Sequence, residues 1–138
     1  MAAIRSKHTK LEVTIVEGLL SRGFNPILHD KTLPGKPDMV LPEYNAVIFA
    51  NSCFFHHHNC HLFKWPVSRA EFWKNKINKN KERDQKNYRQ LMKDGWWILT
   101  VWECAIKGKT RRPVNEVIEK IEFWLRYEVR NKNITGKN

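Results

Sequence analysis

The chain has 138 residues, and we expect one domain over residues 1–129, followed by a flexible C-terminal tail over 130–138. Lys and Arg total 25 against 14 Asp and Glu, and the net charge of +11 favours a polyanionic partner such as nucleic acid, although a merely solvated basic surface would give the same charge. The odd number of cysteines, 3, argues against a disulfide framework and for a reducing cytoplasm, and no apolar run is long enough to span a bilayer.

The hydrophobic pattern of the N-terminal part predicts one helix followed by short strands. Residues 9–12, Thr-Lys-Leu-Glu, form a capping-box motif that opens a helix with an apolar stripe, and Gly23 ends it. Short strands are expected at 25–29 and 38–41, on either side of a Pro/Gly turn. The continuously apolar segment 46–50 predicts a central strand that is buried on both faces.

The second half of the chain continues this alternation. Another capping-box motif at 68–71 predicts a long polar helix that ends near Met92. Residues 96–102 predict a second central strand, and residues 114–127 predict a closing amphipathic helix. The sum is a three-layer α/β domain with a mixed sheet of about four strands, a class of fold whose active sites gather at strand ends.

The segment 53–61, Cys-Phe-Phe-His-His-His-Asn-Cys-His, combines two thiols, four imidazoles and two adjacent phenyl rings. Thiolate and imidazole are the ligands that Zn²⁺ selects, and structural zinc sites are tetrahedral. Cys53, Cys60, one histidine between them and the distant Cys104 would provide three sulfurs and one nitrogen. The alternative is a pair of free buried cysteines beside a fortuitous histidine-rich loop.

The long helix is strongly basic, yet it carries Asp84 on the same face as its apolar residues. A buried carboxylate must be paired, because burying it alone is costly. One candidate partner is a neighbouring Arg or Lys. The other is a ring N–H of a histidine in the segment 53–61, whose tautomer the carboxylate would then fix.

Asp38 opens a strand whose hairpin partner ends near Ala50 and Asn51. A carboxylate and a backbone carbonyl at that edge can share one hard cation. Mg²⁺ in such a place assists phosphodiester cleavage, because it polarises the phosphate and stabilises the leaving oxygen. The plain alternatives are a turn role for Asp38 and, for Glu12, a role as the third residue of the capping box.

The chain contains six short motifs in order, namely LPGKPD at 33–38, VIF at 47–49, CFFHHHNCHLFKWP at 53–66, EFW at 71–73, ERD at 82–84 and VWEC at 101–104. Together they resemble the very short patch repair endonucleases of bacteria, the Vsr-type DNA mismatch endonucleases. The resemblance implies a fold similar to type II restriction endonucleases of the PD-(D/E)xK kind. It also implies nicking of one DNA strand 5′ to the thymine of a T·G mismatch left by deamination of 5-methylcytosine, which starts very short patch repair.

The resemblance also implies roles for individual residues near the scissile phosphate. Asp38 would be a direct Mg²⁺ ligand, together with the backbone carbonyl of Ala50, while Glu12 would act through a water on the metal. His56 would be the general base or orient the attacking water, and Asp84 would be its partner.

Zinc and DNA contacts are implied in the same way. The structural Zn²⁺ would be held by Cys53, His58, Cys60 and Cys104. The mismatch would be met by a wedge of Phe54, Phe55 and Trp73, by Lys76 and Asn80 at the wobble pair, and by Met1 from the minor groove. Aromatic wedges stack on bases and select pairs that are already weakened.

The chain departs from many relatives of this kind at two functional positions. Asn51 stands in place of a histidine, and asparagine can hydrogen-bond water or phosphate but cannot accept a proton at neutral pH. Phe55 stands in place of a tryptophan. His57 and His61 receive no role.

The implied partner is double-stranded DNA with a T·G mismatch, bound by a monomer in the bacterial cytoplasm at the nucleoid, with no membrane and with mismatch-repair proteins as further partners. Two other functions stay open: a zinc-stapled DNA-binding module without catalysis, and a restriction-type endonuclease that cuts a matched site.

Overall fold

The computed structural model describes residues 9–128 and 130–137, to which the structural statements below refer. The elements follow one another as α2 (Lys10–Ser21), β1 (Ile27–Leu28), β2 (Met39–Leu41), η1 (Pro42–Tyr44), β3 (Ala46–Asn51), α3 (Ala70–Lys93), β4 (Trp97–Trp102), η2 (Glu103–Ala105), α4 (Val114–Tyr127) and β5 (Lys132–Ile134). The mixed α/β class that the sequence predicts is confirmed.

The strands form one five-stranded mixed sheet in the order β1-β2-β3-β4-β5. β1, β2 and β3 are antiparallel neighbours, whereas β3, β4 and β5 run parallel. The register of β3 on β4 pairs Ala46 with Trp97 and Asn51 with Trp102, so both central strands end at the same edge of the sheet. The segment after β3 and the 3-10 helix η2 after β4 therefore begin side by side.

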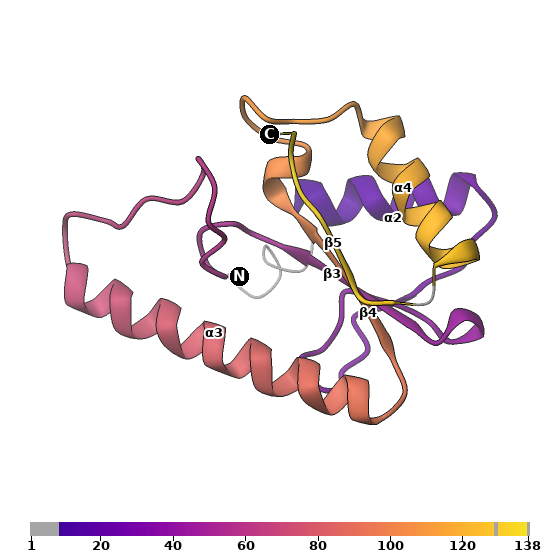
Figure 1. Ribbon diagram of the computed structural model, residues 1–138, viewed down its shortest axis with the longest axis horizontal. Coiled ribbons are helices and arrows are strands. Elements are labelled where there is room, and N and C mark those ends of the chain that lie inside the picture. The colour runs from indigo at the N-terminus through magenta and orange to yellow at the C-terminus, as the bar shows by residue number, and fades with distance from the viewer. Residues whose placement is uncertain (1–8, 129, 138) are drawn as a thin grey trace.

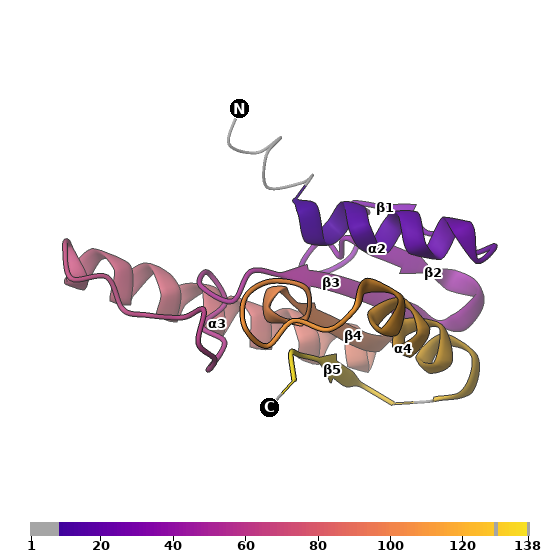
Figure 2. The ribbon, with the colours of Figure 1, turned by 90° about the horizontal axis from the view of Figure 1, so that it is seen from above.

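Helices cover both faces of this sheet. α2 and α4 lie on one side and α3 on the other, and the N-terminal half of α3 extends past the sheet beside the segment that follows β3 (Figures 1 and 2). The larger core cluster joins α2 and α4 to the sheet through residues such as Ile15, Leu99 and Trp124. A smaller cluster, which includes Val47 and Leu91, packs α3 on the opposite face. Within the described ranges, no helix has the length and apolar character needed to cross a membrane.

The structure differs from the sequence expectation at the C-terminal end. Residues 132–134, expected within a flexible tail, form β5, which pairs in parallel with β4 and buries Ile134. The side chain of Asn131 accepts a hydrogen bond from the Ile98 N–H at 2.8 Å and ties the start of this strand to β4. The sheet therefore has five strands instead of the expected four or so. The sequence does not indicate the fifth strand, because three mostly polar residues show no strand pattern and form a strand only by pairing with β4.

The two capping-box motifs have different outcomes. At α2, the Thr9 hydroxyl accepts a hydrogen bond from the Glu12 N–H at 3.2 Å, as predicted, but the Glu12 carboxylate contacts His29. At α3, the prediction of a box at 68–71 is wrong. The helix begins after Arg69, which is in the left-handed conformation with φ 56°, and no side-chain cap bond is made. The Glu12 carboxylate therefore does not cap its own helix. It points to His29 after β1, where it can take part in a ligand-binding site.

Candidate active site and metal centre

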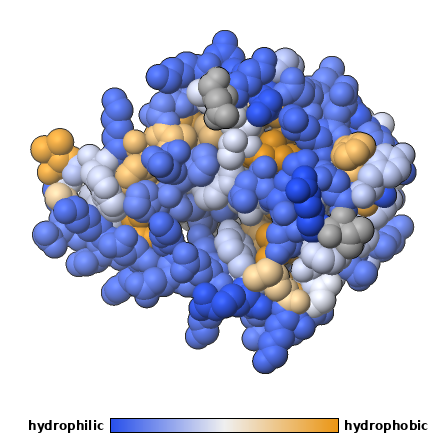
Figure 3. All heavy atoms as spheres, in the orientation of Figure 1, coloured by the Kyte–Doolittle hydropathy of each residue, from blue (hydrophilic) through white to orange (hydrophobic). Residues whose placement is uncertain are grey.

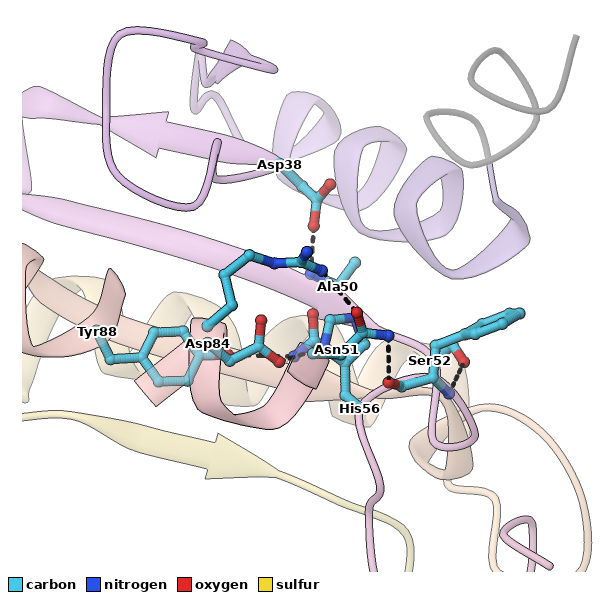
Figure 4. A network of polar contacts seen from close by, with 10 residues as sticks. Asp38, Ala50, Asn51, Ser52, His56, Asp84 and Tyr88 are labelled. Atoms are coloured by element: carbon cyan, nitrogen blue, oxygen red, sulfur yellow. Dashed lines mark hydrogen bonds and ion pairs between the residues drawn. The ribbon is translucent and has the colours of Figure 1, made fainter. Parts of the chain in front are cut away.

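Two carboxylates and a histidine meet where α2 crosses the β1–β2 edge. Asp38 directly precedes β2, and its Oδ2 accepts a hydrogen bond of 2.7 Å from the backbone N–H of Ala50 near the end of β3 (Figure 4). Glu12, in the first turn of α2, is 3% exposed, and its Oε2 lies 2.5 Å from His29 Nε2. Ligand atoms of Glu12, His29 and Asp38 all lie within 4.8 Å of one another, a spacing that suits a shared cation.

The electrostatics of these carboxylates fit a divalent cation. Burial raises the pKa of Asp38, and the hydrogen bond from Ala50 and the nearby His29 and His56 oppose that shift. Burial, followed by the charge of Asp38, raises the pKa of Glu12, against the effect of His29. The buried Glu12 carboxylate and the partly buried Asp38 carboxylate concentrate negative potential at one point, which a bound cation would stabilise.

A histidine–aspartate pair lies beside this cluster. His56 Nδ1 is 2.5 Å from Asp84 Oδ2, which α3 supplies from the other side of the sheet (Figure 4). Of the two candidate partners for Asp84, the structure therefore shows the histidine. A carboxylate that accepts the Nδ1 proton leaves Nε2 as the ring atom able to accept another proton. The two side chains are 27% and 20% exposed, so the pair is open to a substrate.

Asn51 is buried and joins a polar contact that the sequence did not indicate. Its Nδ2 donates a hydrogen bond to the Tyr88 hydroxyl at 3.3 Å. Burial and the neighbouring charge of Asp84 raise the pKa of Tyr88, which also packs edge-on against Phe49. From the sequence alone, Tyr88 has only the spacing of an apolar position on the long helix. The amide nitrogen of Asn51 faces Tyr88.

The four cysteine and histidine residues proposed for zinc come together. Ligand atoms of Cys53, His58, Cys60 and Cys104 lie within 4.8 Å of one another, and His58 Nδ1 is 3.5 Å from Cys53 Sγ and 3.7 Å from Cys104 Sγ. Burial raises the pKa of both the Cys53 and the Cys104 thiols. Three sulfurs and one nitrogen form a donor set typical of structural zinc, and a cation would stabilise the thiolates. The cluster joins the segment after β3 to η2 after β4.

Stacking fixes the orientation of the histidine in this cluster. The His58 ring lies on the Trp102 ring, with centroids 4.3 Å apart and planes 12° apart. Cys104 Sγ also accepts a hydrogen bond of 3.4 Å from the Gly136 N–H, so the segment after β5 closes over the cluster. Both contacts restrict the donor atoms before any cation binds.

The two phenylalanines of the segment lie in different environments. Phe55 is 45% exposed, whereas Phe54 is partly buried in a group of rings. Phe54 packs against Phe55, Phe63 and Trp73, with centroids 5.1, 5.9 and 5.3 Å away. Phe55 is thus a projecting ring with aromatic support behind it. His57, to which the sequence assigns no role, packs against Phe63, and the centroids of the two rings are 4.5 Å apart.

The residues expected at the wobble pair lie on α3. The Asn80 amide donates a hydrogen bond of 3.2 Å to the Phe55 carbonyl, so this side chain holds the aromatic segment. Lys76 is exposed, and Met1 falls outside the described residues. The surface over α3 is hydrophilic (Figure 3). Its exposed cations are Lys74, Lys76, Lys79, Lys81, Arg83, Lys86, Arg89 and Lys93.

A cavity of about 540 Å³ opens beside Ala50 and His56. Leu11, Phe55 and Lys107 contribute to its other walls. The cavity gives a substrate access to the end of β3.

The chain is similar to known mismatch endonucleases and nicking enzymes. The family model described as DNA mismatch endonuclease Vsr matches residues 1–62. The DNA mismatch endonuclease Vsr of Escherichia coli is 42% identical over 125 residues, which cover 91% of this chain and 80% of that protein. The type II nicking enzyme V.NmeAIP of Neisseria meningitidis is 41% identical over 124 residues, with 88% and 89% covered, and V.XorIIP of Xanthomonas oryzae is 40% identical over 106 residues, with 77% and 78% covered.

A carboxylate cluster beside an oriented histidine, in a chain whose relatives are named endonucleases and nicking enzymes, defines a nuclease. The chain belongs to the DNA mismatch endonuclease Vsr family, as its motifs indicate.

Proposed function

We propose that the protein is a Mg²⁺-dependent endonuclease that nicks one strand of duplex DNA 5′ to the thymine of a T·G mismatch and so initiates very short patch repair at deaminated 5-methylcytosine. The observation that carries the proposal is the position of His56, oriented by Asp84, next to the Asp38–Ala50 contact. A proton acceptor and a cation site at one strand end are what hydrolysis of a phosphodiester requires.

Asp38 and the Ala50 carbonyl would hold Mg²⁺ directly, and Glu12 would act through water. The N–H and C=O of one strand residue face the same neighbouring strand, so the Ala50 carbonyl faces the side on which its N–H meets Asp38. When bound, Mg²⁺ supplies positive charge that polarises the phosphate and stabilises the leaving oxygen.

Side chains near the cation site would transfer the proton and position the substrate. His56 Nε2 takes a proton from the attacking water, and Asp84 stabilises the imidazolium that results. Asn51 orients water or phosphate through its amide oxygen, and it cannot replace His56 as the proton acceptor.

The Cys53, His58, Cys60 and Cys104 cluster would hold a structural Zn²⁺, with no open position for substrate. Fixing the segment at this point would set both Phe55 and His56 against α3. Mismatch sensing and strand cleavage would then share one rigid segment.

Recognition of DNA rests on the aromatic ring group and the basic helix. Phe55, backed by Phe54 and Trp73, would wedge into the stack at the weakened T·G pair. Lys76 and Asn80 would contact the mismatch, Met1 would enter from the minor groove, and the other cations of α3 would neutralise phosphates.

The α/β/α layering supports a fold of the PD-(D/E)xK restriction-endonuclease kind, with residues 1–129 as one endonuclease domain and β5 as an added strand. The enzyme would act as a monomer, since each proposed role is filled within one chain, and mismatch-repair proteins would be further partners.

One assay tests the function. Duplexes with T·G or T·A in one sequence context, and a panel of flanking sequences, are incubated with the protein and Mg²⁺. We expect nicking of the T·G duplex alone and its loss in Asp38→Ala, while Asp94→Ala, at the far end of α3, serves as the matched control. Equal cleavage of both duplexes would favour a restriction-type enzyme. Binding without nicking would favour a zinc-stapled DNA-binding module, and persistent Mg²⁺-dependent nicking in Asp38→Ala would reject the catalytic assignment.

A further inference from the structure

His29 belongs to the carboxylate cluster, although neither its sequence position nor the proposed roles above account for it. It directly follows the two-residue strand β1, and its N–H donates a hydrogen bond of 3.1 Å to the Asp38 carbonyl. Its φ of 51° lies in the left-handed region, which non-glycine residues seldom adopt. Residues held in such conformations cluster at functional sites, where the surrounding structure maintains them.

The imidazole of His29 points to α2 and not to solvent. His29 Nε2 lies 2.5 Å from Glu12 Oε2, and the two side chains are 20% and 4% exposed. Asp38 completes a set of one ring nitrogen and two carboxylates whose ligand atoms lie within 4.8 Å of one another. The three side chains come from separate parts of the fold, namely α2, the end of β1 and the start of β2, so packing of the whole edge defines their spacing.

The two carboxylates and the imidazole of this set differ in the metal ions that they prefer to bind. Carboxylate, carbonyl and water suit Mg²⁺ and Mn²⁺ alike, whereas an imidazole nitrogen suits first-row transition ions and is a poor ligand for Mg²⁺. A mixed set of two carboxylates and one imidazole therefore distinguishes two ions of equal charge.

We propose that His29 Nε2 is a direct ligand of the catalytic cation, together with Asp38 and Glu12, and that this set makes the site bind Mn²⁺ in preference to Mg²⁺. The inference rests on the proposed function in one respect, since it takes this cluster as the catalytic cation site. In this proposal Glu12 is a direct ligand and no longer acts through water. The ligand atoms of Glu12, His29 and Asp38 are so closely spaced that a cation among them contacts all three.

The competing role for His29 is that of an ion-pair partner that only neutralises Glu12. The two roles differ in what they require of a bound ion. An ion-pair partner would change the affinities for Mn²⁺ and Mg²⁺ to the same extent and would form no metal–nitrogen bond. A ligand would affect Mn²⁺ more and would place its nitrogen in the coordination shell.

The test uses the full-length, zinc-loaded protein without DNA and the ion Mn²⁺ as the probe. Electron paramagnetic resonance measures free Mn²⁺ during a titration, and competition by Mg²⁺ gives the ratio of the two affinities. Electron spin echo envelope modulation then detects a ¹⁴N nucleus bonded to Mn²⁺. We expect ¹⁴N modulation and tighter binding of Mn²⁺ than of Mg²⁺.

His29→Gln is the decisive variant, because glutamine keeps an N–H donor for Glu12 and removes the ring nitrogen. We expect the ¹⁴N modulation to vanish and the Mn²⁺ affinity to fall by about tenfold or more, with a smaller change for Mg²⁺. His56→Gln is the matched control, since it removes the other histidine near Asp38 and should keep the modulation. Asp38→Asn should abolish Mn²⁺ binding at this site.

Four results would overturn the inference. They are no ¹⁴N modulation in the wild-type protein, modulation that survives in His29→Gln, equal losses for both ions, or Mn²⁺ binding that is unaffected in Asp38→Asn. A wild-type spectrum without ¹⁴N modulation overturns the inference even if the variant fails to fold. Because binding is measured without DNA, failure to nick a T·G duplex would reject the proposed function and leave this readout intact.

Discussion

The imidazole of His56 and the carboxylate of Asp84 meet at 2.5 Å although 28 residues separate them in the chain. His56 lies on the segment after β3, and Asp84 lies on the long helix that packs against the opposite sheet face from α2. Two residues further along the segment, His58 lies among the cysteines. The segment is thus held at two neighbouring points, and the exposed Phe55 directly precedes the first of them.

Replacing Asp84 by Asn tests whether this contact supports catalysis. The amide keeps the size of the side chain but cannot stabilise an imidazolium and can hold the wrong tautomer. We expect single-turnover nicking of a T·G duplex to slow by about 10²–10⁴-fold, with little change in DNA affinity. Glu82→Gln, an exposed acid on the same helix, is the matched control. Wild-type nicking in Asp84→Asn would rule out a role for the pair.

Replacing Cys104 by Ser tests the proposed zinc site. Serine is a poor zinc ligand, and the three remaining donors leave the site open. We expect zinc content, measured by elemental analysis, to fall well below one ion per chain, and the segment 53–61 to exchange its amide hydrogens faster. His61→Ala, a histidine of the same segment outside the cluster, should keep its zinc. Full zinc content in Cys104→Ser would refute this ligand set.

The sequence predicts most of the framework because long periodic segments carry their own signal. The helix α4 has the predicted bounds, since its apolar positions repeat with helical spacing and all face one core. The sequence also brings together Asp38 and Ala50 correctly, because a hairpin register limits which residues can meet.

The contacts that the sequence does not predict depend on tertiary packing. His29 follows a strand of only two residues, and its contact with Glu12 depends on how α2 crosses that edge. Tyr88 has the spacing of an apolar helix position, and only the buried end of β3 turns its hydroxyl into a partner for Asn51. β5 has too few residues to show a period of two, so pairing with β4 alone identifies it.

Replacing Phe55 by Ala tests the aromatic wedge. A ring that stacks on a base contributes about 1–3 kcal/mol, so affinity for a T·G duplex should fall by roughly tenfold or more. Thermal stability should change little, because this ring is 45% exposed. Phe123→Ala removes a ring that is 54% exposed on α4 and should leave binding unchanged. Fluorescence anisotropy with labelled duplexes measures both variants, and equal affinities would exclude a wedge at this position.

Replacing Tyr88 by Phe tests the contact with Asn51. The Asn51 amide is 3% exposed and would lose its hydrogen-bond acceptor, which costs about 1 kcal/mol in the free energy of unfolding. Because the amide is then less constrained, nicking should slow as well. Tyr127→Phe removes a hydroxyl from a side chain that is 69% exposed and should be neutral in urea denaturation. Equal stability and activity in both variants would leave Tyr88 as a packing residue only.

Replacing Gly18 by Ala tests how closely α2 packs on α4. Helix propensity alone predicts a gain of about 1 kcal/mol, because alanine restricts the unfolded chain and glycine does not. An added Cβ would lie 2.5 Å from the Cδ1 atom of Ile118, a buried, β-branched side chain with few alternative rotamers. Overpacking of this kind costs about 1–3 kcal/mol, so we expect a net loss of stability in urea denaturation.

The double variant Gly18→Ala with Ile118→Ala separates the two effects. Alanine lacks the Cδ1, Cγ1 and Cγ2 atoms, which the new methyl group would meet at 2.5, 2.6 and 3.0 Å, so the pair should be more stable than the sum of the single changes predicts. Close packing of α2 also sets the position of Glu12, six residues before Gly18 on the same helix, and the Gly18→Ala variant should therefore weaken the cation site measured by Mn²⁺ titration. If the Gly18→Ala protein is more stable than the wild type, α2 and α4 move apart with little loss of free energy. Helix propensity would then determine the sign of the change in the free energy of unfolding.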